Sequence, residues 1–253
     1  MNSLTAAHLI TDEGLHAGSV DDSDSGTTAV SVFFSQAGPF FCTNLGDSRA
    51  VIASESCSKQ GAKYVVKPLS KDQTFFRKDE RARCRGMGGE VMTIGQLQGE
   101  EPMHDDFDVD LGNQIDEGGD PPRLWEPNGL QPGCAFSRSI GDRGAKKYGC
   151  VADPEIDQFV LKPEDRMLVL ASDGVWEFYT NQARRAFFSV VRKRSETPTP
   201  AQNVVDIIHS HMRYGASMET LVQGLCDVVA RSYSTWISRE VRCRRNASAQ
   251  NRI

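Results

Sequence analysis

The feature that most constrains this chain is a short apolar run that ends in an aspartate. Residues 167–171 carry no charge and are followed at once by Ser172-Asp173-Gly174. Such a run predicts a strand buried on both faces, and the glycine allows a sharp turn after it. A carboxylate at the exit of a buried strand suits a hard metal ion, which takes oxygen ligands from several segments, and Glu177 could add a second carboxylate. The competing interpretation is that Asp173 only closes a turn or caps a helix.

Two more aspartates lie at predicted strand-end turns. Residues 27–35, 39–45 and 48–53 are β-type runs whose short connections predict an antiparallel meander. Asp47 follows a glycine in the second connection, and Asp142 follows another glycine farther along the chain. Because metal sites draw ligands from separate segments, we expect Asp47, Asp142 and Asp173 to gather at one end of the fold. Asp142 has a competing structural role, in which its carboxylate accepts hydrogen bonds from loop amides.

Helical patterns flank this β-rich part. Residues 1–18 have a modest helical pattern, and the charged residues 72–85 predict a short exposed helix. Val204, Ile208 and Met212 share one helix face. Residues 217–238 predict a long amphipathic helix packed along one flank of the sheets. Its apolar face consists of Leu221, Leu225, Val228, Val229, Ser232 and Trp236.

Two acidic segments could be mistaken for calcium loops. Residues 98–120 contain many acidic residues and little apolar content, which predicts a flexible acidic loop that contacts partners or acts as a flap. Residues 20–26 resemble the start of a calcium loop, but Ser23 and Ser25 stand where acidic or amide ligands are required. We therefore interpret 20–26 as a polar loop.

Composition narrows the class of protein. The chain has 253 residues, 39% hydrophobic and 25% charged, which is typical of a globular protein with a full core. Its net charge of −5 offers no basic face for nucleic acid, and its apolar runs are too short to cross a bilayer. The seven cysteines show no zinc spacing, so we expect reduced structural thiols and a cytoplasmic or nuclear location.

Five ordered motifs lie between residues 20 and 182. They are Ser25-Gly26-Thr27-Thr28-Ala29-Val30; Gly46-Asp47-Ser48-Arg49; Asp72 with Glu80, Arg83 and Gly88-Gly89-Glu90-Val91; Ser137-Arg138-Ser139-Ile140-Gly141-Asp142 with Ala152-Asp153-Pro154-Glu155; and Ser172-Asp173-Gly174-Val175-Trp176-Glu177. Together these motifs resemble the PPM-type (type 2C) metal-dependent serine/threonine protein phosphatases. Gln73 stands where the family usually has a histidine, within the third motif. Two weaker segments, 121–125 and 232–236, are similar to a plant and protist subgroup that fuses this domain to cyclic-nucleotide-binding and kinase domains.

The resemblance implies an α+β fold with two packed antiparallel β-sheets flanked by α-helices, incomplete in this chain. It implies hydrolysis of phosphoserine and phosphothreonine esters in protein substrates by a water activated by magnesium or manganese. Asp173 would be the catalytic metal ligand, with Gly174 beside it, and Asp47 and Glu177 would complete a weaker site. Asp142 and Arg138 would support the site. Residues 1–242 would form a partial phosphatase domain and 243–253 a disordered tail.

The chain departs from the family pattern in the segments that supply most metal ligands. The family's Asp-Gly-His-Gly-Gly segment does not occur in this sequence, and Arg244-Arg245 stand where relatives carry a late acidic pair. We therefore expect little hydrolysis by the chain as written, because one carboxylate holds magnesium poorly. Two hypotheses remain open: a fragment of an active phosphatase, or a catalytically inactive pseudophosphatase that acts as a binding and regulatory module. An unrelated α/β protein with strand-end aspartates is the third alternative.

Overall fold

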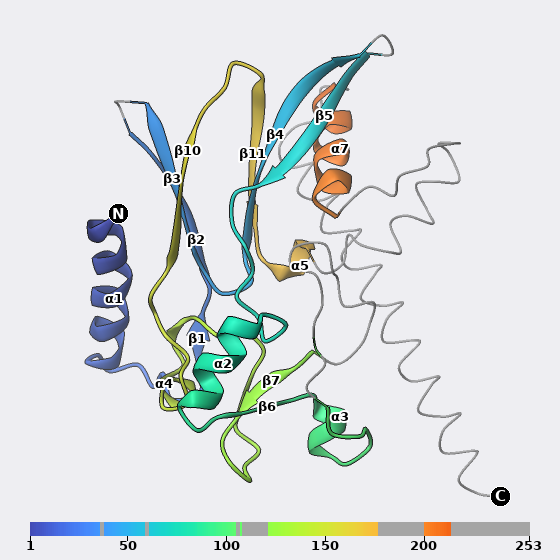
Figure 1. The fold of residues 1–253 in the computed structure, drawn as a ribbon. Coiled ribbons are helices and arrows are strands. Elements are labelled where there is room, and N and C mark those ends of the chain that lie inside the picture. The colour runs from blue at the N-terminus through green and yellow to red at the C-terminus, as the bar shows by residue number, and fades with distance from the viewer. Residues whose placement is uncertain (36–37, 59–60, 105–106, 108–120, 177–199, 214–253) are drawn as a thin grey trace, which may run out of the picture. The chain divides into compact units, whose positions relative to one another are not determined.

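The computed structural model describes residues 1–35, 38–58, 61–104, 107, 121–176 and 200–213 (Figure 1). The chain divides into two compact units, Met1–Ser172 and Asp173–Ile253, and each is described by itself. All described strands belong to the first unit. They form four antiparallel sheets: two three-stranded sheets build the core, and two sheets of shorter strands, one with two strands and one with three, lie at one end.

The first large sheet has the strand order β10-β3-β2. Its strands are β2 (Ala29–Phe34), β3 (Pro39–Leu45) and β10 (Glu155–Val160). β2 and β3 form the predicted hairpin, in which Phe34 pairs with Phe40. β10 returns from far along the chain to pair with the other edge of β3. β3 is therefore the central strand, and its side chains are the most buried of the three.

The second large sheet has the order β11-β4-β5. Its strands are β4 (Arg49–Ser58), β5 (Gly61–Pro68) and β11 (Asp165–Ala171). β11 contains the apolar run 167–171 that precedes Asp173, and the structure confirms this run as a strand. The prediction that it is buried on both faces is wrong, because β11 is an outer strand among the described strands and its side chains are half-buried or exposed, Leu170 being 39% exposed.

The two large sheets pack face to face around one apolar core. Core side chains come from strands of both sheets, and the alternation of inward and outward residues decides which contribute. They are Phe40, Cys42, Ala50, Ile52 and Leu69, with Val30, Val32, Phe159 and Leu168 packed against them. The predicted meander is wrong at its second connection, because β3 and β4 lie in different sheets. The turn at Gly46-Asp47 carries the chain from one sheet to the other, which places Phe40 and Ile52 on facing sides of the core.

Helices and short strands complete the first unit (Figure 1). The helix predicted near the N-terminus is α1 (Asn2–His16). β1 (Gly26–Thr27) pairs with β9 (Ile140–Gly141), and α4 (Arg143–Lys146) follows. The fourth sheet comprises β6 (Glu90–Met92), β7 (Arg123–Trp125) and β8 (Pro132–Cys134), with α3 (Ile94–Leu97) after β6. A second core of Phe75, Cys84, Val91, Leu124, Ala145 and Cys150 lies beneath α2.

The helix predicted within 72–85 is α2 (Lys78–Gly86), and its predicted exposure is wrong. Glu80, Arg81 and Cys84 are buried, so one face of this highly charged helix points into the protein. The burial is possible because Glu80 meets arginines from three places in the chain, and paired charges tolerate burial that single charges do not.

The cysteines behave as predicted in the described part of the chain. Cys42, Cys84, Cys134 and Cys150 are free thiols. Burial raises the pKa of Cys42 to about 11 and that of Cys84 to about 12, so both thiols stay protonated at neutral pH. These residues fill the core and are not nucleophiles.

The second unit contributes α5 (Asp173–Trp176) and α7 (Pro200–Arg213). α7 confirms the helix predicted around Val204, which is fully buried. The predicted helix 217–238 and the predicted tail 243–253 lie outside the described residues, as does most of the acidic stretch 98–120. None of the described helices is both long and apolar enough to span a membrane.

Candidate functional site

The turn that carries Asp47 is built around a glycine. Gly46 has φ +97°, and a Cβ there would overlap the Thr28 side chain. A residue with a side chain would therefore be strained and would also clash. Asp47 follows it between β3 and β4 and is half-buried.

Gln73 holds this turn in place. Its Oε1 accepts a hydrogen bond from the Gly46 N–H at 2.7 Å, and its Nε2 donates to the Asn44 carbonyl at 3.1 Å. The Gln73 backbone N–H also donates to the Gly46 carbonyl at 2.9 Å. Gln73 is fully buried, so these bonds satisfy polar groups that water does not reach. The sequence indicated Gln73 only as a departure from the family's histidine and did not predict this role.

The same residue reaches the segment that leads to Asp142. The Gln73 carbonyl accepts hydrogen bonds from the Ser137 N–H at 2.8 Å and from the Ser137 hydroxyl at 2.9 Å. Gln73 therefore fixes the Asp47 turn relative to residues 137–142. Two of the predicted site segments are held together by one buried side chain and its backbone.

Glu80 is the centre of a buried ion-pair network. Its carboxylate accepts hydrogen bonds from Arg83 Nη2 at 2.6 Å, from Arg138 Nη2 at 2.6 Å and from the Ser137 hydroxyl. Burial by itself would raise the pKa of Glu80, but the hydrogen bonds from Arg138, Arg83 and Ser137 outweigh it and lower the pKa to about 2. The carboxylate is therefore ionised at every physiological pH.

Arg138, which the resemblance suggested as a supporting residue, uses most of its donors within this network. It binds Glu80 and also donates from Nη1 to the Asp153 carbonyl at 2.9 Å. Arg138 thus ties residues 137–142 to α2. This geometry does not favour a direct contact between Arg138 and substrate. The supporting role of Arg138 stays a prediction.

Asp142 stands in a different environment from Glu80. It adopts φ 51°, in the left-handed region, immediately before α4. A Cβ on Gly26 would overlap the Asp142 carboxylate, so β1 passes directly against it. Within the described part of the chain, Asp142 Oδ2 is buried and has no hydrogen-bond partner. Burial raises the pKa of Asp142, and the carboxylates of Asp22 and Asp24 add to this against the opposing effects of Ser139 and Lys146.

α1 fixes the neighbourhood of Asp142 through side chains that sequence reasoning missed. Asp12 accepts a hydrogen bond from the Gly141 N–H at 2.8 Å and pairs with Lys146 at 3.1 Å. His16 bridges Asp12, at 3.3 Å, and the buried Asp22. The loop 20–26 is therefore a connecting loop, as predicted, but one of its carboxylates is buried and paired. The Asp12–His16 pair is local, four residues apart on α1, but Gly141 and Lys146 reach Asp12 from far along the chain, which no local pattern signals.

The remaining predicted ligands belong to the second unit or lie outside the described residues. Asp173 is exposed and begins α5, and its Oδ1 accepts a hydrogen bond from the Gly174 N–H at 2.7 Å. Glu177 is outside the described residues. The gathering of Asp47 and Asp142 with Asp173 stays a prediction.

One acidic group in the described residues has the spacing of a metal site but not its charge balance. Ligand oxygens of Asp79, Glu80 and Glu155 lie within 4.8 Å of one another. Arg77 donates to both Asp79 and Glu155 at 2.6 Å, and Glu80 is held by two further arginines. A metal ion would have to displace guanidinium groups, so this cluster is better explained as an ion-pair network.

Asp142 and Asp173 fit a hard metal ion better. Both are carboxylates at strand-end turns, the oxygen type that magnesium and manganese prefer. The buried Oδ2 of Asp142 lacks a partner, and a nearby cation would supply one.

Comparison with known proteins identifies the family. The sequence profile of the protein phosphatase 2C family matches residues 2–217. The chain is 37% identical over 237 residues to "Probable protein phosphatase 2C 35" of Arabidopsis thaliana, covering 94% of this chain and 58% of the relative. It is 32% identical over 191 residues to "Probable protein phosphatase 2C 73" of the same plant, covering 76% of this chain and 44% of the relative. This chain belongs to the protein phosphatase 2C family.

A solved structure supports the fold. The crystal structure of serine-threonine phosphatase 2C from Toxoplasma gondii superposes with a TM-score of 0.56 at 19% identity, covering 90% of this chain and 58% of that one. The α+β fold of packed antiparallel sheets predicted from the resemblance is thereby confirmed. The chain spans little more than half the length of the first of its relatives and of this structure.

Proposed function

We propose that the protein is a metal-dependent serine/threonine phosphatase that hydrolyses phosphoserine and phosphothreonine esters in proteins. The observation that carries the proposal is the family match over residues 2–217, which spans both predicted site segments of the first unit. The family is metal-dependent. Magnesium or manganese is the ion we propose, since the candidate ligands are carboxylates.

The proposed roles follow the family resemblance. Asp173, with Gly174, Asp47 and Glu177, would hold the ion, which when bound would supply a water of lowered pKa for attack on the phosphate ester. Asp142 would be a further carboxylate that supports the site. Gln73 keeps the Asp47 turn in register with the segment of Asp142, and Arg138 with Glu80 anchors that segment to α2.

The alternative, an inactive pseudophosphatase, is less favoured. A binding module would gain nothing from a buried Asp142 Oδ2 that has no hydrogen-bond partner among the described residues, because such an atom lowers stability. Fusion to cyclic-nucleotide-binding or kinase domains stays a prediction, as does a cytoplasmic or nuclear location.

The proposal is tested by adding the family's metal-binding segment that does not occur in this sequence. A fusion supplying an Asp-Gly-His-Gly-Gly segment with its upstream helix, combined with Arg244→Asp, is assayed on phosphoserine peptides with magnesium or manganese. We expect metal-dependent hydrolysis that Asp173→Ala abolishes and that the exposed control Asp153→Ala leaves intact. The 253-residue chain itself should show little turnover.

Two results would contradict this assignment. A folded fusion that stays inert with either metal would favour the pseudophosphatase. Turnover by the unmodified chain that persists in Asp173→Ala would place the essential ligands elsewhere.

A further inference from the structure

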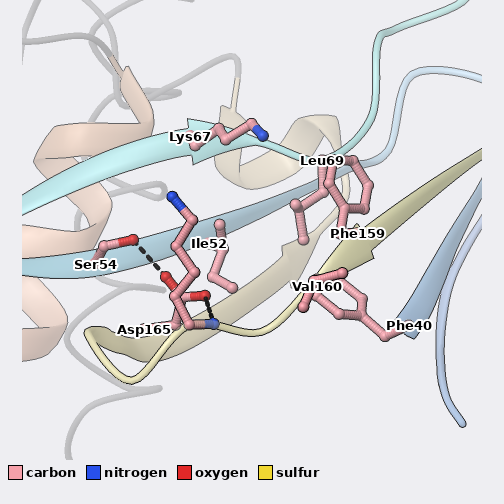
Figure 2. Close-up of a pocket in the computed structure, with 9 residues that line it drawn as sticks. Phe40, Ile52, Ser54, Lys67, Leu69, Phe159, Val160 and Asp165 are labelled. Atoms are coloured by element: carbon pink, nitrogen blue, oxygen red, sulfur yellow. Dashed lines mark hydrogen bonds between the residues drawn. The ribbon is translucent and has the colours of Figure 1, made fainter. Parts of the chain in front are cut away.

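An apolar groove opens at the end of the sandwich opposite the Asp47 turn. It lies between the two large sheets, where Phe40, Phe159 and Val160 of one sheet face Ile52 of the other and Leu69 just after β5 (Figure 2). Its volume is about 60 Å³. A buried water needs roughly 10–15 Å³ measured in this way, so the groove has room for roughly four to six waters. That space accommodates one aliphatic side chain and is too small for a long acyl chain.

The rings of Phe40 and Phe159 line one wall, and the Phe34 ring lies beside Phe40 outside the groove. The ring centroids of Phe34 and Phe40 lie 5.4 Å apart, and those of Phe40 and Phe159 also lie 5.4 Å apart. Phe40 is buried, but Phe34 is 59% exposed and Val160 is 67% exposed. The apolar surface of the core therefore continues outward to the rim of the groove instead of being closed by polar side chains.

The rim carries two positive charges, one on β5 and one in the turn between β10 and β11. Lys67 lies over the Phe159 ring, with Nζ 5.1 Å from the ring centroid (Figure 2). Lys162 lines the groove from the β10–β11 turn. Asp165 also lines the groove, and its carboxylate accepts hydrogen bonds from the Ser54 hydroxyl and the Lys162 backbone N–H. Among the ion pairs of the described residues, none involves the ammonium group of Lys67 or Lys162.

We propose that this groove is a docking site for an acidic peptide segment of a protein substrate, one that inserts a leucine or isoleucine between two carboxylates. The volume of the groove fits a single aliphatic side chain. The two lysines would attract carboxylates that stand next to that side chain in the peptide sequence. The proposal rests on the proposed phosphatase function, because it assigns the peptide to a substrate.

The length of β3 sets the spacing that such a substrate needs. Phe40 lines the groove, and Asp47 follows the other end of the same strand, seven residues later. At about 3.3 Å per residue the separation is roughly 23 Å. A docking motif would therefore stand at least about seven extended residues from the phosphorylated serine or threonine.

The test measures binding without turnover. The probe is the peptide acetyl-Glu-Asp-Leu-Glu-Asp-amide, titrated into the 253-residue chain while methyl resonances of Ile52 and Leu69 are followed by NMR. We expect saturable shifts of these methyl resonances, which should be lost when the peptide leucine is replaced by serine.

Lys67→Glu and Lys162→Glu should each weaken binding about three- to tenfold, since each reverses one exposed ion pair. Lys147→Glu, at an exposed lysine immediately after α4, is the matched control and should leave binding unchanged.

Val160→Asp provides a second variant that does not disturb the core, because Val160 is already exposed. It should abolish the shifts at an unchanged melting temperature. Absence of shifts in the wild-type chain, or shifts unaffected by all three groove variants, would overturn the proposal. Shifts produced by decanoate but not by the peptide would assign the groove to a lipid anion and would also overturn it.

The phosphatase proposal is tested separately from this one. Peptide binding with an inert fusion would leave the groove as a docking site and remove the enzymatic role. An active fusion whose KM is the same for phosphopeptides with and without the docking motif would remove the groove from substrate recognition.

Discussion

Two carboxylates of the first unit, the buried Glu80 and the half-buried Asp142, have opposite surroundings. Glu80 receives hydrogen bonds from two arginines and a serine, and its pKa is lowered to about 2. Within the described part of the chain, Asp142 has one buried oxygen, Oδ2, without a hydrogen-bond partner, and burial raises its pKa. Both residues belong to motifs of the same family, yet the described residues satisfy the Glu80 carboxylate more fully than that of Asp142. The comparison indicates that Glu80 stabilises the architecture, whereas a ligand role for Asp142 stays a prediction.

The largest effect is expected from Glu80→Ala. It leaves Arg83 and Arg138 without their shared carboxylate in a buried place, which costs about 3–5 kcal/mol of unfolding free energy. Chemical denaturation at pH 7 measures this loss. The control is Asp79→Asn, since the Asp79 side chain is 63% exposed and its ion pair contributes less than about 1 kcal/mol. Equal losses in both variants would show that Glu80 is not the centre of the network.

The unfolding free energy should also depend on pH in the way that the depressed pKa of Glu80 predicts. The folded-state pKa of Glu80 is depressed from 4.5 to about 2, so its contribution is fully present above pH 4.5 and is lost as the pH falls toward 2. The contribution is on the order of 3 kcal/mol. Denaturation curves of the wild type and Glu80→Gln between pH 2 and 6 should therefore converge at the acid end. Parallel curves across this range would contradict the depressed pKa.

The sequence predicted the strand-end turns but not the partners that hold them. Asp47 and Asp142 were found because a glycine and an apolar run mark each turn locally. The separation of β3 and β4 into two sheets was missed, since a two-residue connection is compatible with a hairpin and with a crossing between sheets. The burial of α2 was missed because its charges are neutralised by Arg138, far along the chain. The groove escaped prediction for a similar reason: its lining comes from both sheets.

Gly26→Ala tests the close approach of β1 to Asp142. The new Cβ would overlap the Asp142 carboxylate and would lie 2.9 Å from the Ile140 carbonyl oxygen. We expect a loss of about 1–3 kcal/mol in unfolding free energy, typical of overpacking. The loss should shrink in an Asp142→Ala background, because one of the two clashes is then removed. Strict additivity in this double-mutant cycle would mean that the two residues do not touch.

The smallest and most informative change is Asp142→Asn, which should raise the melting temperature at pH 7. Asparagine tolerates the left-handed backbone at this position, so the substitution alters charge and leaves the turn intact. Because the folded-state pKa of Asp142 is raised, its ionised form lowers stability as the pH rises past the unfolded value, and the neutral amide avoids this cost. Asp153→Asn, at an exposed aspartate, is the control and should change little. Added manganese should then stabilise the wild type more than the Asp142→Asn variant, since only the carboxylate offers the cation a negative ligand. A lower melting temperature for Asp142→Asn without metal would mean that the Asp142 carboxylate already has a partner, and the contrast with Glu80 would be lost.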